Sequence, residues 1–195
     1  MNSYKLIIGL LICCSPLSLL AQTNSNGPVK IRKFSLYAGA GPSIYFNNLI
    51  LAKNYVHELG YSFSGRIMWE PEHLLSLGIE TGYYRLYSVS DKLHPGIKIS
   101  NVAIPIQLVV GMKFLKSFYF NFSSGQSILL NKVDTPEHGN IDGTSFSLGD
   151  FAGSLGYKHK LKNDRVSIAV ETKFFYSSKL NDKNIALLFM VGYAL

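Results

Sequence analysis

The sequence predicts an all-β protein, an eight-stranded antiparallel up-and-down β-barrel of the transmembrane kind, and three observations support this fold class. Hydrophobic and polar residues alternate with a period of two over most of the chain from residue 34 onward. The connections between the alternating segments are short and long in turn. Aromatic residues gather near both ends of the segments, where the two interfaces of a membrane would lie.

Length, composition and charge fit a single domain. The chain has 195 residues, of which 47% are hydrophobic and 16% are charged, so it lacks the charge excess of a disordered chain. Its formal net charge of +7 suits the anionic phosphates of outer-membrane lipid or an acidic partner. The sequence shows no basic helix and no recognised nucleic-acid motif, and we therefore expect no nucleic-acid partner.

Residues 1–21 have the pattern of a signal peptide. Lys5 supplies the positive start, residues 6–12 form a short apolar stretch, and a small residue, Ala21, ends the segment where a leader peptidase would cleave. A retained transmembrane helix is the alternative. Because Pro16 breaks the apolar run before it reaches the roughly 20 residues that span a bilayer, we expect cleavage.

The predicted leader contains both cysteines of the chain. Cys13 and Cys14 lie within it, so the mature protein would have no disulfide, no thiolate nucleophile and no cysteine metal ligand. Residues 22–33 are polar and are expected to form a short spacer. Residues 34–195 are expected to form the barrel domain.

The first expected strand, residues 34–46, shows the alternation clearly, with an apolar face and a face of small and polar residues. The apolar face is made by Phe34, Leu36, Ala38, Ala40, Ile44 and Phe46. The other face is made by Ser35, Tyr37, Gly39, Gly41, Ser43 and Tyr45. In a transmembrane barrel the first set faces lipid and the second set faces the lumen.

Seven further segments repeat this pattern and complete a barrel of eight strands. They span residues 61–70, 75–84, 102–114, 118–123, 146–160, 166–177 and 185–194. Their apolar faces include Ile67, Ile79, Leu108, Phe120, Leu155, Ile168 and Phe189. The alternation is weakest in 146–160, where Phe151, Leu155 and Tyr157 oppose Asp150, Ala152, Ser154 and Lys158.

The connections predict which rim of the barrel faces outward. Tight turns are expected at residues 70–73, 115–117 and 162–165, and long polar loops at residues 47–60, 88–98 and 131–145. A fourth, shorter polar loop is expected at 178–184. In bacterial barrels the tight turns face the periplasm and the long loops face the outside.

Two aromatic girdles accompany the rims. Near the tight turns lie Phe34, Trp69, Phe114, Phe118, Tyr157 and Tyr193, and near the long loops lie Phe46, Tyr61, Tyr87, Phe146 and Tyr176. Amphipathic rings favour the headgroup zone of a bilayer, although aromatic residues also favour strands in general. A soluble, lipocalin-like ligand-binding barrel with its apolar face inside is the alternative fold. The chain has no Gly-x-Trp signature near its first strand and no C-terminal helical pattern.

Three short motifs resemble the PorT-like outer-membrane β-barrel domain of Bacteroidota. They are the segment Ile104-Pro105-Ile106, the leader end at Ala21-Gln22 and the opening strand with Gly39-x-Gly41. The resemblance covers about residues 34–195. It implies a barrel in the bacterial outer membrane and implies little about activity, since the link of PorT members to protein secretion offers an analogy only.

Charged residues of both signs are expected in the lumen. An eight-stranded barrel is just wide enough to be filled by its inward side chains, so these charges should pair as a plug rather than line a pore. A proton or small-ion path is the alternative. The predicted lumen charge network consists of Arg66, Glu80, Lys113, Asp150, Glu171 and Lys173.

The histidines do not form a recognisable catalytic or metal site in the sequence. His57, His94 and His138 fall in long loops beside many serines, but no pairing typical of a lipid hydrolase accompanies them. His94 and His138 have no ligand spacing with Asp134 and Glu137. We therefore predict no catalytic residue, no cofactor and no metal.

These observations together predict a non-enzymatic outer-membrane barrel, a scaffold whose outward loops bind an extracellular ligand or another envelope protein. Outer-membrane lipid would surround it. The segments expected to make the contacts are residues 47–60, 88–98 and 131–145. A lipid-modifying enzyme and a narrow channel are the alternative functions.

Overall fold

The computed structural model describes residues 33–46, 56–71, 75–90, 98–115, 117–135, 139–161, 165–179 and 181–195. The predicted signal peptide, residues 1–21, and all but the last residue of the predicted spacer, residues 22–33, lie outside this part of the chain. No helix among the described residues is long and apolar enough to cross a membrane.

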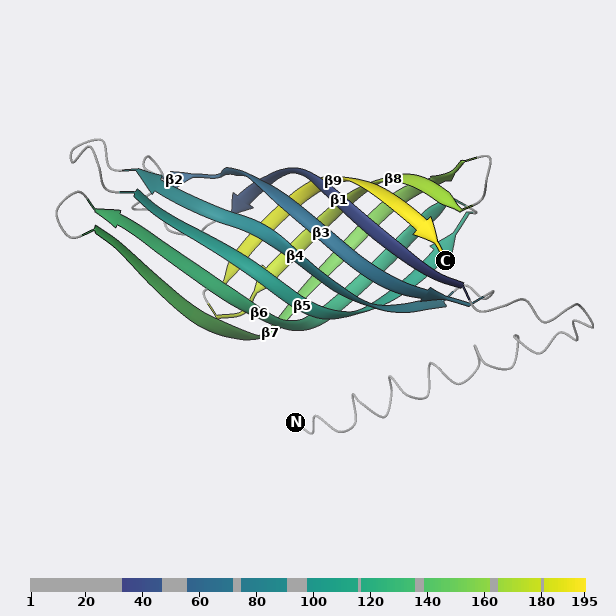
Figure 1. Ribbon diagram of the computed structural model, residues 1–195, viewed down its shortest axis with the longest axis horizontal. Coiled ribbons are helices and arrows are strands. Elements are labelled where there is room, and N and C mark those ends of the chain that lie inside the picture. Colours follow the sequence, from purple (N-terminus) through teal and green to yellow (C-terminus); the bar gives the residue numbers. More distant parts are fainter. Residues whose placement is uncertain are drawn as a thin grey trace, which may run out of the picture. The chain divides into compact units, whose positions relative to one another are not determined.

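Eight long antiparallel strands form a closed barrel, as the sequence predicted, and a two-residue strand joins them (Figure 1). The strands are β1 (Lys33–Phe46), β2 (Val56–His57), β3 (Leu59–Glu70), β4 (Leu75–Ser90), β5 (Lys98–Phe114), β6 (Phe118–Thr135), β7 (Gly139–Lys160), β8 (Val166–Ser177) and β9 (Asp182–Ala194). Each long strand pairs with its neighbour in the chain, and β1 pairs with β9 to close the sheet. Closure gives the backbone groups of every long strand a partner on both sides within the barrel wall.

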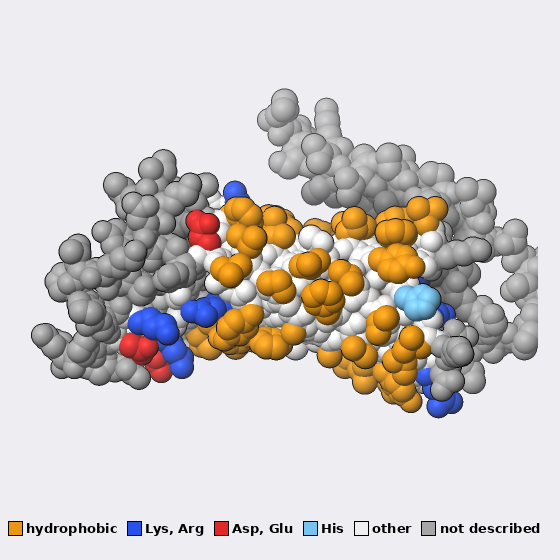
Figure 2. All heavy atoms as spheres, turned by 90° about the horizontal axis from the view of Figure 1, so that it is seen from above, with side chains coloured by type: hydrophobic (Ala, Val, Ile, Leu, Met, Phe, Trp, Pro, Cys, Tyr) orange, Lys and Arg blue, Asp and Glu red, His pale blue; other side chains and the backbone are white. Residues whose placement is uncertain are grey.

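The outer wall of the barrel is apolar. Ile67, Leu108 and Phe189 are 53%, 70% and 59% exposed, whereas the inward Gln107 is 2% exposed. Figure 2 shows hydrophobic side chains spread over the wall, with the charged side chains toward the two ends. A soluble cup would have its apolar face inside, so this distribution excludes the lipocalin-like alternative and fits hydrocarbon around the wall.

Side chains fill the described part of the lumen. Two apolar clusters lie inside it, and in one of them the rings of Tyr84 and Phe175 stack with centroids 5.0 Å apart. The first cluster contains Tyr37, Met68, Val109, Tyr119, Ala169, Ala186, Leu188 and Met190. The second contains Tyr45, Tyr84, Leu86, Ala103, Leu129, Ala152 and Phe175. A cavity of about 20 Å³ near the tight turns has room for about one water molecule.

The prediction of a long loop at residues 131–145 is wrong for most of that segment. β6 continues through Thr135 and β7 begins at Gly139, so this segment is a β-hairpin. Opposite charges face each other across the strands, with Lys98 opposite Asp134 and Lys132 opposite Asp142. Such cross-strand pairs stabilise a solvated hairpin without the apolar alternation that identified the other strands. β2 also lies within the predicted loop at 47–60, where it pairs with β4.

A β-bulge explains the weak alternation of residues 146–160. Leu148 pairs with Gln126 and Asp150 pairs with Gly125, so Gly149 is an extra residue in β7, and its φ is 77°. The extra residue reverses the phase of the strand. Leu148 is therefore 66% exposed on the outer wall while Asp150 is fully buried in the lumen.

Candidate functional site

Four charged side chains meet in the middle of the lumen. Arg66 of β3 binds the Glu171 carboxylate through both terminal guanidinium nitrogens, with Nη1 3.3 Å from Oε1. The same Nη1 lies 3.4 Å from Oε2 of Glu80 on β4. Lys173 of β8 pairs with the other oxygen of Glu80. None of the four is more than 5% exposed, and two positive charges balance two negative ones.

Tyrosine rings surround this central cluster. The Tyr119 hydroxyl donates to Oε2 of Glu171 over 2.7 Å. The guanidinium carbon of Arg66 lies 5.4 Å from the Tyr37 ring centre and 5.7 Å from the Tyr119 ring centre. Cation–π contacts and hydrogen bonds of this kind compensate the loss of hydration that burial imposes on the charges. The arrangement closes the centre of the described lumen with paired charges.

A second cluster lies toward the tight turns and includes two residues that sequence reasoning left out of the network. Lys113, predicted to belong to the network, pairs with Glu70, which also accepts from the Tyr37 hydroxyl. Lys158 lies 3.4 Å from Glu70 and donates to the Tyr37 oxygen over 2.8 Å. The alternation of strands had placed Glu70 and Lys158 on the lumen face, and that signal could have identified both.

A third group lies at the loop end of the lumen and contains Asp150, the remaining residue of the predicted network. Its Oδ1 accepts from the Ser147 hydroxyl over 2.5 Å and from the Ser178 amide over 2.8 Å. Asp182, which sequence reasoning did not single out, accepts from the Tyr45 hydroxyl over 2.5 Å. The six predicted lumen residues thus divide into four at the centre and one at each end.

The barrel wall is taller on one side, where a sheet extends from the long-loop end of the barrel (Figure 1). We call residues 87–90 of β4, 98–101 of β5, 131–135 of β6 and 139–148 of β7 the loop-side sheet. Figure 1 shows these strand ends reaching beyond β8 and β9. Residues 141–144 are exposed at every position, so both faces of the sheet are solvated there.

The loop-side sheet has a free edge along β7. Pairing of β7 with β8 begins at Phe151, opposite Tyr176, and within the described chain residues 139–148 pair with β6 alone. Among the described residues, side chains cover only the base of this edge, where Ser178 Oγ donates to the Leu148 carbonyl over 2.5 Å. The remaining edge presents backbone donors and acceptors that another extended chain can use.

Several residues that the sequence offered as metal ligands or catalytic groups lie outside the part of the chain that the structure describes. His94, His138 and Glu137 lie outside the described residues, and of His57 only the backbone is described, in β2. Among the described residues no group of three His, Cys, Asp or Glu side chains could hold a metal ion.

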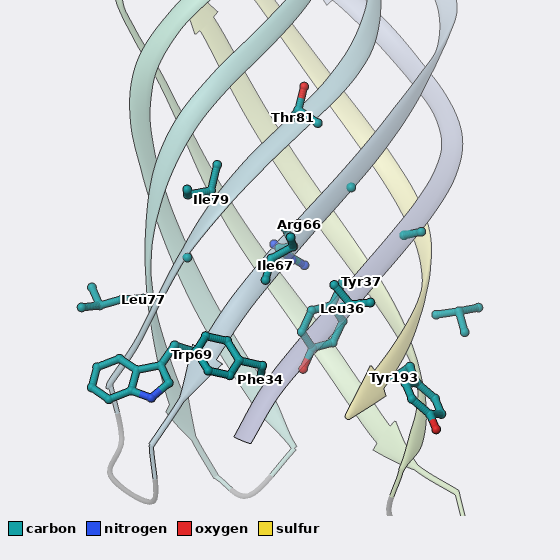
Figure 3. Close-up of a pocket in the computed structure, with 14 residues that line it drawn as sticks. Phe34, Leu36, Tyr37, Arg66, Ile67, Trp69, Leu77, Ile79, Thr81 and Tyr193 are labelled. Atoms are coloured by element: carbon teal, nitrogen blue, oxygen red, sulfur yellow. The ribbon is translucent and has the colours of Figure 1, made fainter. Parts of the chain in front are cut away.

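The outer wall has an apolar groove of about 810 Å³ over β9, β1, β3 and β4. Its floor contains small residues, with Ala38 opposite Gly65 and Gly65 opposite Thr81. Figure 3 shows Phe34, Trp69 and Tyr193 at the end of the groove nearest the tight turns. Because the groove opens toward the lipid-facing side, hydrocarbon chains cover it in a membrane.

The structure resembles small outer-membrane barrels of known structure. Ail, the attachment invasion locus protein of Yersinia pestis, crystallised with the heparin analogue sucrose octasulfate, aligns with a TM-score of 0.59 and 11% identity over 85% of this chain and 100% of its own. Neisserial surface protein A aligns with a TM-score of 0.54 and 15% identity over 82% of this chain and 96% of its own. No model of a protein family and no curated protein matches the sequence. The closed barrel, its apolar wall and these likenesses together identify an eight-stranded β-barrel of the bacterial outer-membrane type.

Proposed function

We propose that this barrel is a non-enzymatic scaffold that binds an extracellular or envelope partner through its loop-side sheet. The free edge of β7 at residues 139–148 is the observation that supports this role. An extended segment of a partner protein can add a strand to such an edge, with main-chain hydrogen bonds supplying affinity and neighbouring side chains supplying specificity. The partner we infer is therefore a polypeptide that presents an extended segment.

Side chains on the edge strand add to this surface. Ile141 is 57% exposed and Phe146 is 64% exposed, and an exposed apolar side chain next to a free strand edge favours association. Lys132 and Asp142 face each other on the neighbouring strands. Because the sheet offers both charges and apolar contacts, a partner strand of mixed composition fits it best.

The filled lumen favours a binding role over the alternative role of a channel. Its described charged side chains pair with one another at the centre and toward the tight turns, and the cavity there holds about 20 Å³. Paired, buried charges give an ion no continuous aqueous path.

We further propose that the chain is a PorT-like barrel of Bacteroidota. Two of the motifs behind this assignment have a clear structural position. Pro105 lies in β5 between Ile104 and Ile106, and a Cβ atom at Gly39 would approach the Phe189 carbonyl oxygen to 2.5 Å. Gly39 therefore permits the close approach of β1 and β9 that closes the barrel. Ail was crystallised in complex with a heparin analogue, and a binding role for a barrel of similar fold agrees with that.

Replacement of residues 130–144 by Asn-Gly tests the proposed role, because it removes residues 139–144 of the free edge. It keeps the pair Leu129 and Ser145 at the end of a two-residue turn. A photo-crosslinking side chain at Ile141 should form an adduct with a partner on intact cells. The matched control places it at Ile185, which is 39% exposed on the outer wall. We expect adducts with a protein from position 141 and with lipid from position 185.

The same experiment can contradict the proposal. The shortened variant should still form a heat-modifiable barrel while the partner recovered through Ile141 no longer co-purifies with it. If the shortened barrel retains that partner, the loop-side sheet is not the binding surface. If position 141 yields no more protein adduct than position 185, the edge binds no protein under those conditions and the role is wrong.

A further inference from the structure

Two buried carboxylates at the loop end of the lumen have no positively charged partner among the described residues. Asp150 is 0% exposed and Asp182 is 4% exposed. Every ion pair found within the described chain involves Glu70, Glu80 or Glu171 instead. An unpaired buried carboxylate is destabilising because it loses its hydration without gaining a counter-charge. Among the described residues, this end of the lumen therefore has two buried carboxylates and no cation paired with them.

Among the buried side-chain atoms that have no hydrogen-bond partner in the described chain, those on β7 and β9 are three acceptor oxygens. They are Oδ2 of Asp150, Oδ2 of Asp182 and Oδ1 of Asn184, which is fully buried. The other polar atom of each of these side chains already has a hydrogen-bond partner. Oδ1 of each aspartate accepts from a hydroxyl, and Nδ2 of Asn184 donates to the Arg85 carbonyl over 3.4 Å. Each of these three oxygens can accept a hydrogen bond, and an ionised carboxylate or an amide oxygen cannot donate one.

The topology places these oxygens at the same end of the lumen. Asp182 and Asn184 are two positions apart on β9, and successive alternate residues face the same side of a strand. Asp182 lies opposite Ser177 of β8. The Ser177 hydroxyl donates to Ser147 over 3.1 Å, and Ser147 in turn donates to Asp150. Ser177, the cross-strand neighbour of Asp182, is therefore linked through Ser147 to Asp150.

We propose that Asp150, Asp182 and Asn184 bind a calcium ion at the loop end of the lumen. Carboxylate and amide oxygens without nitrogen or sulfur are the ligand set of a hard cation, and calcium tolerates irregular geometry with six to eight oxygens. Two carboxylates neutralise its charge, and the amide oxygen adds a neutral ligand. The site needs only two acidic residues, which agrees with the absence of a group of three acidic, His or Cys side chains from the described residues.

A calcium ion here would fix the base of the free edge. Asp150 follows the bulge at Gly149, where β7 leaves β8 and enters the loop-side sheet, and Asp182 opens β9. Bound calcium would therefore join β7 and β9 across the end of β8. The inference stands on the lumen residues alone and does not depend on partner binding by the loop-side sheet.

The test uses the full-length protein extracted from membranes in detergent, stripped with EDTA and titrated with calcium chloride in a calorimeter. We expect one calcium ion per chain and an unfolding temperature that rises with calcium concentration. The variants D182N and D150N should each lose at least tenfold in affinity. The matched control is E70Q, which neutralises another lumen carboxylate that already has two lysine partners and should bind calcium as the parent does.

A second readout covers the case in which an aspartate variant fails to fold. Terbium replaces calcium in oxygen sites, and the Tyr45 phenol, hydrogen-bonded to Asp182, lies close enough to sensitise its emission. The parent should show tyrosine-sensitised terbium emission that calcium displaces, and Y45F should lower it. Absence of calcium binding by the parent would mean that water molecules satisfy these oxygens and would overturn the proposal, as would unchanged affinity in a folded D182N.

Discussion

At the residue scale, the alternation of side chains predicted which charges enter the lumen but not which of them pair. Arg66 and Glu80 lie directly opposite each other on adjacent strands, a contact that strand alignment can suggest. Arg66 and Glu171 are 105 residues apart in the chain and meet across the lumen. That contact depends on the stagger of all eight strands, which no local pattern specifies.

The paired centre of the lumen predicts a strong difference between single and double substitutions. Arg66→Met should destabilise the barrel by about 3–5 kcal/mol, because it leaves Glu171 buried without its cation. The double variant Arg66→Met with Glu171→Gln should recover most of that loss, since the new amide oxygen still accepts from Tyr119 and the substitution removes the unpaired charge. Urea unfolding in lipid vesicles, followed by the shift of the folded band on a gel, measures both. Equal stability of the single and double variants would contradict this account of the cluster.

At the element scale, the strands that cross the wall were predictable and the solvated ones were not. β1 and β8 occupy the ranges that their apolar alternation indicated, because hydrocarbon favours apolar side chains at the outward positions. Residues 131–145 lack that requirement, since residues 141–144 are exposed on both faces of the sheet. Polar composition there was read as a loop, whereas opposed charges and backbone pairing produce a hairpin.

The bulge in β7 allows a matched comparison of two glycines. A Cβ atom would meet nothing within 4 Å at either Gly149 or Gly153, but only Gly149 has a positive φ, 77°. Gly149→Ala should therefore destabilise the barrel by about 1–2 kcal/mol through backbone strain alone, and Gly153→Ala should not. Folded fraction against urea concentration in lipid vesicles checks both variants. Equal stability of the two would show that the bulge imposes no strain on residue 149.

At the scale of the whole molecule, the barrel has an apolar outer wall and buries charged and polar side chains together with two apolar clusters in its lumen, unlike a soluble domain. The count of eight strands, the turn lengths and the aromatic positions were sufficient to predict this. Phe118 and Tyr157 form one part of the girdle near the tight turns, with ring centres 5.2 Å apart. The taller wall on one side escaped prediction, because strand ends outside the membrane leave no apolar signal in the sequence.

Insertion into the outer membrane as a closed barrel is the central claim, and extraction followed by gel migration tests it most directly. The envelope is fractionated from cells that express the full sequence, and the outer membrane is solubilised in detergent. The account predicts a membrane-bound protein whose unboiled band migrates differently from its boiled band, because a closed β-barrel resists unfolding by detergent at room temperature. Recovery in the soluble periplasmic fraction, with the same migration before and after boiling, would contradict it.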